Sequence, residues 1–245
     1  MFFSGKSDIG KRRATNQDSY SIISLPEDCY LCTVCDGMGG ANGGNVASEI
    51  ACSVYTKYVS DNFIPEDHNR ASLLRKAVAA ANTAVYEKAQ AEDALRGMGT
   101  TLVSALVEKN GTACVINVGD SRMYSVDSGQ MRQITRDHSY VQYLVDMGQL
   151  TVKEAENASI RNIIIRSIGN EEESNPDLFT LDLSPGGYIL LCSDGLTNCV
   201  GNDLIAEEIH ADTQEELDLC AERLIECANE SGGIDNITVI LGKIV

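Results

Sequence analysis

Apolar and β-branched residues cluster into short runs near the start of the chain, with polar turns between them. Residues 18–24 (DSYSIIS) and 29–35 (CYLCTVC) have the composition of strands, and residues 25–28 (LPED) form a turn between them. Apolar positions then recur at intervals of three and four over residues 47–58 and 74–85, the pattern of amphipathic helices. The sequence therefore predicts a hairpin followed by two helices in succession.

The rest of the chain predicts a meander of strands and a further helix. The predicted strands cover residues 100–107, 113–118, 123–126, 177–183, 187–193 and 236–241. Residues 217–228 carry an apolar stripe of helical period. Strands in meanders with helices in pairs indicate an α+β fold: two stacked antiparallel sheets with helices on both outer faces, a four-layer α-β-β-α sandwich.

The segment over residues 147–176 has a different character. Residues 151–154 (TVKE) form a capping box for a short helix, and the irregular stretch that follows ends in three glutamates at 171–173. We interpret the segment as a flap over the sheet edges, with a plain surface insertion as the alternative. Because nothing between 1 and 245 resembles a linker, we expect a single domain.

The charge of the chain is strongly negative, with a formal value of −17 and a pI near 4.5. Nucleic acids and anionic membranes need basic patches, so neither is an expected partner. No apolar run approaches the roughly 18 residues of a membrane span, and the first residues lack the layout of a signal peptide. We expect a soluble, cytoplasmic monomer.

Nine cysteines are spread through the chain, and Cys29, Cys32 and Cys35 form C-x2-C-x2-C. This spacing resembles the start of an iron–sulfur motif, but the fourth ligand would fall at Gly39. An odd number of cysteines in predicted helices and strands favours reduced, buried thiols over a disulfide framework.

A glycine-rich stretch at residues 34–44 (VCDGMGGANGG) follows the second predicted strand. A P-loop would end in Gly-Lys-Ser/Thr, and a dinucleotide fingerprint starting at Gly37 would need a glycine where Asn42 stands. Neither nucleotide motif fits. What remains is Asp36 at the end of a strand, with glycines that let other backbone approach whatever the carboxylate holds.

Three more aspartates stand at the ends of predicted strands beside glycine or a turn residue: Asp120, Asp194 and Asp235. Each alone is more typical of a turn aspartate. Together with Asp36 they would repel one another at one sheet edge unless cations separated them. Oxygen ligands suit Mg²⁺ or Mn²⁺, and two such ions ~3.5–4 Å apart can activate a water for phosphate-ester hydrolysis.

Six motifs in order carry a family resemblance: RATNQD (13–18), DGMGG (36–40), MGTT (98–101), GDSRMY (119–124), SDGLT (193–197) and DNIT (235–238). The chain resembles, over nearly its whole length, the metal-dependent serine/threonine protein phosphatases of the type-2C class in their bacterial form. The resemblance implies hydrolysis of phosphoserine and phosphothreonine on proteins, opposing a Ser/Thr kinase, with two Mn²⁺ or Mg²⁺ ions and a third, weaker ion.

The resemblance also implies roles for individual residues. By this likeness Asp36 bridges the two ions, the Gly37 carbonyl binds one of them, Asp194 and Asp235 complete the coordination, Asp18 holds metal-bound water and Asp120 helps to bind the third ion. Arg13 would anchor the phosphate, since a guanidinium presents donors matched to phosphoryl oxygens. The alternative for Arg13 is an ordinary surface arginine in the basic run 11–13.

Two departures from the family pattern limit what the resemblance implies. Met38 stands where many eukaryotic relatives carry a histidine thought to act as a general acid, and residues 158–159 (Ala-Ser) replace a His-Pro that is frequent in bacterial flaps. His138 remains, and we predict a structural role for it. The rival functions are a two-metal phosphodiesterase and a catalytically silent phosphoprotein-binding module.

Overall fold

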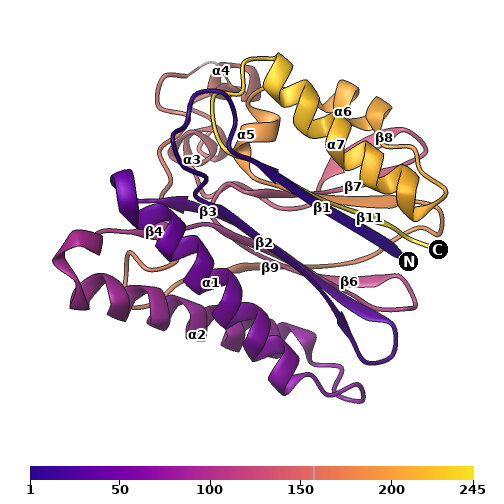
Figure 1. Cartoon of the computed structure of the whole chain (residues 1–245), viewed down its shortest axis with the longest axis horizontal. Coiled ribbons are helices and arrows are strands. Elements are labelled where there is room, and N and C mark those ends of the chain that lie inside the picture. Colours follow the sequence, from indigo (N-terminus) through magenta and orange to yellow (C-terminus); the bar gives the residue numbers. More distant parts are fainter. Residues whose placement is uncertain (157) are drawn as a thin grey trace.

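Two antiparallel sheets packed face to face form the centre of the molecule (Figure 1). The structure is a computed structural model and describes residues 1–156 and 158–245. Residue 157, within the predicted flap, lies outside the described residues, as do the side chains of residues 40–42 and 156.

Each sheet mixes strands from distant parts of the chain. One has the order β1 (Phe2–Asp8), β11 (Ile237–Lys243), β10 (Tyr188–Cys192), β7 (Arg122–Asp127) and β8 (Gln130–Gln133). The other has the order β2 (Asp18–Leu25), β3 (Cys29–Met38), β5 (Leu102–Val107), β6 (Thr112–Val118) and β9 (Asp177–Asp182), and the short β4 (Gly99–Thr100) pairs with the end of β3. The first and last strands are therefore neighbours, with Phe2 opposite Lys243.

Two pairs of helices cover the outer faces (Figure 1). Long helices α1 (Gly40–Asn62) and α2 (Arg70–Ala91) lie on the sheet of β2 and β3, while α6 (Asn202–Glu208) and α7 (Gln214–Glu230) lie on the sheet of β1 and β11. The short elements are η1 (Asp93–Leu95), α3 (Tyr140–Asp146), α4 (Val152–Glu156) and α5 (Asp194–Thr197). The predicted capping box starts α4, because the Glu154 carboxylate accepts the Thr151 amide at 2.8 Å.

Three apolar layers fill the spaces between these four layers. Residues such as Val34, Val103 and Ile240 pack between the two sheets. Tyr55 belongs to the cluster that α1 and α2 form with their sheet, and Leu217 to the cluster beneath α6 and α7. The predicted α-β-β-α sandwich is confirmed, since each face of each sheet has an apolar surface to bury.

The structure contains short elements that were not predicted, such as β8 and α3, and it departs from the prediction in three further places. Strand β1 was not predicted, because its side chains are mostly half-buried and include Ser4 and Lys6. Helix α6 was not predicted, because its seven residues are too few to show a clear helical period of apolar positions. The strand predicted over 100–107 is interrupted at Thr101, whose amide donates to the Asp36 carbonyl at 2.9 Å.

All nine cysteines are free thiols, as predicted, and seven of them are buried. In the C-x2-C-x2-C run, Cys29 and Cys35 face the helices while Cys32 faces the other sheet. This alternation follows from the period of a strand and keeps the three sulfurs from one ion.

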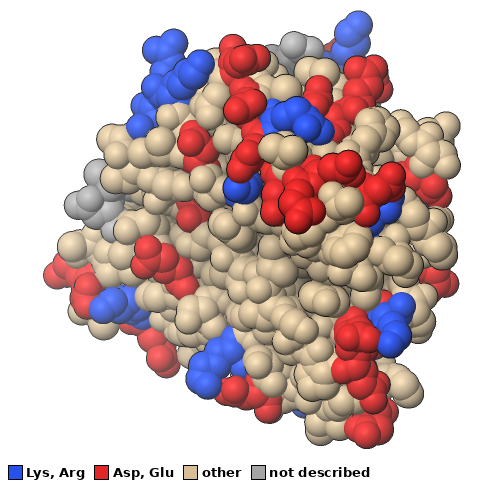
Figure 2. Space-filling view, turned by 45° about the vertical axis from the view of Figure 1, so that its right-hand side comes forward, with Lys and Arg blue, Asp and Glu red and all other residues tan. Residues whose placement is uncertain are grey.

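Acidic side chains gather over the upper half of the face drawn in Figure 2, the layer of α6 and α7 in Figure 1. Exposed glutamates of α7 include Glu215, Glu222, Glu226 and Glu230. Within the described ranges, no helix has the length and apolar character needed to cross a membrane.

Candidate active site

The predicted site residues lie in or next to the ends of β2, β3, β6, β10 and β11 that point away from the chain termini (Figure 1). Asp18 and Asp36 are paired across β2 and β3 in one sheet. Asp194 follows β10 and Asp235 precedes β11 in the other sheet, and Asp120 lies on the connection from one sheet to the other. The site is therefore assembled from both sheets rather than from one sheet edge.

Asp18 links the two sheets through its side chain. Its Oδ2 accepts hydrogen bonds from Ser193 Oγ at 2.8 Å and from Thr238 Oγ1 at 2.6 Å. Ser193 Oγ also accepts the Thr238 amide at 3.0 Å. The sequence analysis assigned no role to these two hydroxyls, although each lies in a motif with a predicted ligand. The sequence signal that could have identified them is their position in the motifs that contain Asp194 and Asp235.

The end of β3 is held by the paired threonines of the MGTT motif. Thr101 Oγ1 accepts the Asp36 amide at 2.9 Å, and Thr100 Oγ1 donates to the Asp36 carbonyl at 2.9 Å. A Cβ on Gly37 would lie 2.0 Å from the Gly44 carbonyl oxygen, so no other residue fits there without displacing the start of α1. This close packing fixes the backbone on both sides of the Asp36 side chain.

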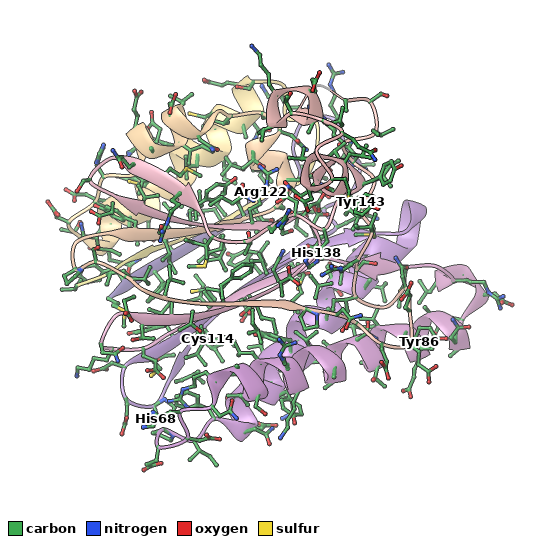
Figure 3. All side chains as sticks on the ribbon, turned by 180° about the vertical axis from the view of Figure 1, so that it is seen from behind. His68, Tyr86, Cys114, Arg122, His138 and Tyr143 are labelled. Carbon is green, nitrogen blue, oxygen red and sulfur yellow. The ribbon has the colours of Figure 1, made fainter. Side chains whose placement is uncertain are left out.

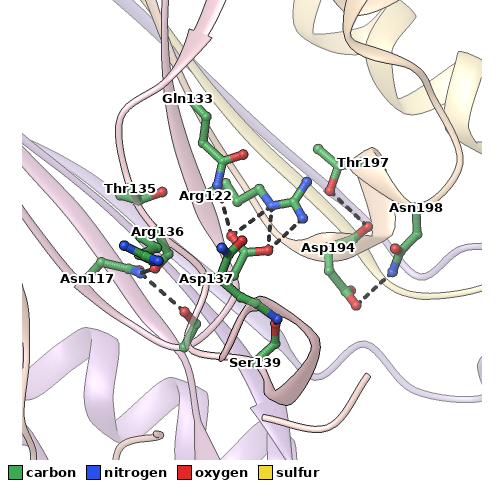
Figure 4. A network of polar contacts seen from close by, with 12 residues as sticks. Asn117, Arg122, Gln133, Thr135, Arg136, Asp137, Ser139, Asp194, Thr197 and Asn198 are labelled. Atoms are coloured by element: carbon green, nitrogen blue, oxygen red, sulfur yellow. Dashed lines mark hydrogen bonds and ion pairs between the residues drawn. The ribbon is translucent and has the colours of Figure 1, made fainter. Parts of the chain in front are cut away.

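Asp194 and Asp120 line the same cavity of about 660 Å³. Asp194 begins α5, and its Oδ2 accepts the Asn198 amide group at 2.8 Å (Figure 4). On the other side of the cavity, α3 and α4 contribute apolar side chains including Val141 and Val152. The cavity thus opens between the carboxylates and the start of the flap.

An arginine that the sequence analysis did not single out lies in the same cavity. The Arg122 guanidinium binds Asp137 with Nη2 at 2.6 Å and Nε at 3.0 Å (Figure 4). Asp137 also accepts from Gln133 at 2.9 Å. The charge of Arg122 is therefore already balanced by a carboxylate, and the pair supports the wall of the cavity.

Arg13 lies against the carboxylates, where it pairs with one of them. Its Nη2 is 2.6 Å from Asp235 Oδ2, and the Arg13 side chain is 49% exposed. The nearby charges of Asp36 and Asp194 also act on Arg13, and its pKa is raised, chiefly by the hydrogen bond to Asp235. A half-exposed guanidinium in this position is available to a substrate anion.

The electrostatics of the site are those of buried acids that repel one another. Burial is the main cause that raises the pKa of Asp18 to about 7, of Asp120 to about 7 and of Asp194 to about 6. Burial followed by the charge of Asp18 holds the pKa of Asp36 well above its usual range. Such shifts mean that the folded protein pays to keep these carboxylates ionised unless positive charge is supplied.

The residues fit divalent ions by their chemistry. Asp18 Oδ1 and Asp194 Oδ1 are buried and have no hydrogen-bond partner, and the donor set consists of oxygen atoms, which Mg²⁺ and Mn²⁺ prefer. In the part of the chain that the structure describes, no three Asp, Glu, His or Cys side chains are arranged to hold an ion by themselves. Asp235 is turned to Arg13, and an ion would need that carboxylate, the Gly37 carbonyl or water to complete its shell.

Comparison with known proteins identifies similar sequences. The family model described as Protein phosphatase 2C matches residues 5–231. Protein phosphatase PhpP of Streptococcus pneumoniae is 36% identical over 236 residues, which cover 96% of this chain and 94% of that protein. Serine/threonine protein phosphatase PstP of Mycobacterium tuberculosis is 36% identical over 247 residues, which cover 99% of this chain and 45% of that protein.

Solved structures of similar proteins share the fold. The serine/threonine phosphatase of S. agalactiae superimposes with a TM-score of 0.92 at 35% identity and covers 99% of both chains. The catalytic domain of PstP in complex with two manganese ions gives a TM-score of 0.84 at 35% identity, covering 98% of this chain and 96% of that one.

Proposed function

Because this chain belongs to the protein phosphatase 2C family and is a metal-dependent protein serine/threonine phosphatase, we propose that its buried carboxylates hold two Mn²⁺ or Mg²⁺ ions for hydrolysis of phosphoserine and phosphothreonine monoesters. The observation that carries this proposal is the cluster of acids with raised pKa values and two unpartnered buried oxygens. Cations are the partners that such a cluster lacks.

The proposed ligands are Asp36, the Gly37 carbonyl, Asp194 and Asp235, with Asp18 holding water and Asp120 helping to hold a third, weaker ion. When bound, these cations would lower the pKa of nearby water, supplying both the hydroxide that attacks phosphorus and the proton that the departing alkoxide takes up. The manganese-bound structure of PstP supports two ions.

Arg13 binds the substrate phosphate in this proposal. A guanidinium stays charged at any working pH and can offer a fork of donors to two phosphoryl oxygens. Arg13 now uses one nitrogen on Asp235. This ion pair would therefore separate when the site is filled. The guanidinium would then bind the phosphate, and the carboxylate would bind a metal ion.

The cavity beside Asp120 and Asp194 is where the polypeptide around the phosphorylated residue would lie. Its volume of about 660 Å³ holds several side chains, and its walls come from the start of the flap on one side and from the α5–α6 connection on the other. The substrates are phosphorylated proteins, among them a Ser/Thr kinase and its targets. We further propose that residues 1–245 form one catalytic domain that acts as a cytoplasmic monomer.

Met38 and Asp120 bear on the leaving group. A serine or threonine alkoxide needs a proton as the P–O bond breaks, whereas an aryl phosphate releases a stabilised phenolate and needs little help. Methionine cannot give that proton. We assign its delivery to the Asp120 side of the site, where a buried carboxylate lies next to Asp194 on the cavity wall.

The test is hydrolysis of a phosphothreonine peptide, an aryl phosphate and a cyclic phosphodiester by the full chain after chelation, with and without added Mn²⁺. We expect Mn²⁺ to restore hydrolysis of the two monoesters and to give none of the diester. Hydrolysis without divalent metal would contradict the proposal. Preference for the diester would favour a phosphodiesterase, and Mn²⁺ binding without turnover would favour a phosphoprotein-binding module.

A further inference from the structure

His138 is buried at the base of the flap, with 4% of its surface exposed. It lies between β8 and α3, close to the ends of the sheets, and Figure 3 shows it deep in the molecule while Tyr143 of α3 lies at the surface. His68 and His210 are exposed. A buried imidazole this close to the carboxylates contacts three separate segments of the chain.

The first segment is the loop that carries Asp120. The His138 amide donates to the Gly119 carbonyl at 2.9 Å, and the Gly119 amide donates to His138 Nδ1 at 3.1 Å. Gly119 has φ +108°, and a Cβ there would lie 2.5 Å from Thr101 Cγ2. The residue before Asp120 thus has a conformation that favours glycine, and His138 holds it on both its polar groups.

The other two segments are the flap and strand β9. The His138 carbonyl accepts the Ile165 amide at 2.8 Å. Because Nδ1 accepts a hydrogen bond, the neutral ring carries its proton on Nε2, which lies 3.2 Å from Asp177 Oδ2. Asp177 Oδ1 accepts from Arg166 at 3.0 Å. One histidine therefore ties the far end of the flap to the Asp120 loop.

We propose that His138 is a positioning residue for Asp120, and that it couples the flap to the part of the site that serves the leaving group. The inference rests on the role proposed above for Asp120. His138 does not touch the substrate. It fixes the Gly119 peptide, so that the Asp120 carboxylate stays on the cavity wall when the serine or threonine alkoxide leaves phosphorus and takes up a proton.

Two substitutions separate the two ring nitrogens. His138→Asn places a carboxamide oxygen close to the position of Nδ1, so that it can still accept the Gly119 amide. His138→Gln reaches toward the position of Nε2 and leaves the Gly119 amide without its acceptor. Both variants remove the ring, so a general loss of packing affects both, whereas only His138→Gln should release the Asp120 loop.

The first measurement is amide hydrogen exchange in the peptide covering residues 117–121, which needs no turnover. We expect exchange there to stay within about threefold of wild type in His138→Asn and to rise by roughly tenfold or more in His138→Gln, since about 1.4 kcal/mol of lost hydrogen bonding corresponds to a factor of ten. Equal exchange in the two variants would overturn the proposal and leave His138 a packed core residue.

The second measurement is the ratio of phosphothreonine-peptide to aryl-phosphate turnover at saturating substrate and Mn²⁺, with Asp120→Ala as the reference. Asp120→Ala should lower this ratio sharply, His138→Gln should lower it about tenfold, and His138→Asn should keep it within about threefold. A ratio unchanged in His138→Gln would sink the inference. Absence of Mn²⁺-dependent turnover in wild type would sink the proposed function instead, and the exchange experiment would still decide the contact.

Coupling to the flap is tested at Asp177. Asp177→Asn keeps an oxygen that accepts the Nε2 proton, and Asp177→Ala removes it. Exchange over 117–121 should rise about two- to threefold in Asp177→Ala, as far as in His138→Asn, which loses the same Nε2 contact, and stay at the wild-type value in Asp177→Asn. If Asp177→Ala leaves this exchange unchanged, the flap is not coupled to Asp120 through the imidazole.

Discussion

Replacing Arg13 by alanine separates substrate binding from metal binding at this site. Arg13 is half exposed and pairs with Asp235 at 2.6 Å. A hydrogen bond to a charged group contributes about 1.5–3 kcal/mol, and each 1.36 kcal/mol is a factor of ten in rate. Loss of one such contact to the phosphate should therefore lower kcat/KM by roughly one to two decades, and loss of a second contact at the lower value would bring the decrease to about three.

The same substitution should not weaken metal binding. In the structure one oxygen of Asp235 is occupied by the guanidinium, and Arg13→Ala releases it. Because an ion pair this exposed contributes about 0.2–1 kcal/mol, releasing it can tighten Mn²⁺ binding by at most about fivefold. We expect Mn²⁺ affinity between unchanged and fivefold tighter.

The assay combines titration calorimetry with Mn²⁺ and steady-state hydrolysis of a phosphothreonine peptide. Arg12→Ala is the matched control, because Arg12 is the exposed neighbour in the same basic run and should keep both values near wild type. Asp194→Ala supplies the comparison for a lost ligand. If Mn²⁺ affinity fell as far in Arg13→Ala as in Asp194→Ala, the assignment of Arg13 to the phosphate would be refuted.

Other expected outcomes follow from the same site. Asp36→Ala and Asp194→Ala should each abolish turnover of both monoesters. Neither substitution should lower the Tm of the chelated protein, because burial already penalises these charges. Residual Mn²⁺-dependent turnover above a hundredth of wild type would contradict their role as ligands. The pKa of Asp18 is raised to about 7, so its contribution to stability is present below its ordinary value near 4 and is lost as pH rises through about 7. The Tm of the chelated protein should accordingly fall between pH 5.5 and pH 8, and it should fall less steeply in Asp18→Asn. Added Mn²⁺ should raise the Tm more at pH 8 than at pH 5.5. An equal increase in Tm at the two pH values would refute this linkage. Alkylation of native protein should reach the partly exposed Cys199 and Cys227 first and spare aryl-phosphate turnover, and a phosphocysteine intermediate would contradict the mechanism.

Periodic apolar patterns made most of the fold predictable, because burial on one face of a helix or between two sheets leaves a signal in neighbouring residues. The strands predicted over 29–35 and 113–118 and the helix over 217–228 correspond to β3, β6 and α7. Strand β1 was not predicted, because half-buried positions admit both polar and apolar side chains. The break at Thr101 was not predicted, because it is caused by hydrogen bonds to Asp36, a residue 65 positions away in the sequence.

The carboxylates proposed as ligands stand out in the sequence because each follows or precedes an apolar strand, and the structure places them close enough to act on one another. The residues that bind these carboxylates could not be predicted from the sequence. The hydroxyls of Ser193 and Thr238 meet Asp18 across 175 and 220 residues, and Arg13 meets Asp235 across 222. Contacts of this kind depend on how the sheets stack, which local pattern does not encode. His138 was predicted to be structural, and its burial fits that reading, but its bonds to Gly119 are specific to the Asp120 loop.

The pairing of β1 with β11 places the first strand of the sequence beside the last. Strand β1 therefore has no β11 to pair with until residues 237–243 have been synthesised, and Asp235 and Thr238 lie beside or within that same segment. Asp18 then gains the hydroxyl that joins it to the second sheet. A chain that stops before residue 235 lacks Asp235, Thr238 and the strand that pairs with both β1 and β10. If Asp235 is a metal ligand as proposed, we expect such a truncated chain to show no phosphatase turnover.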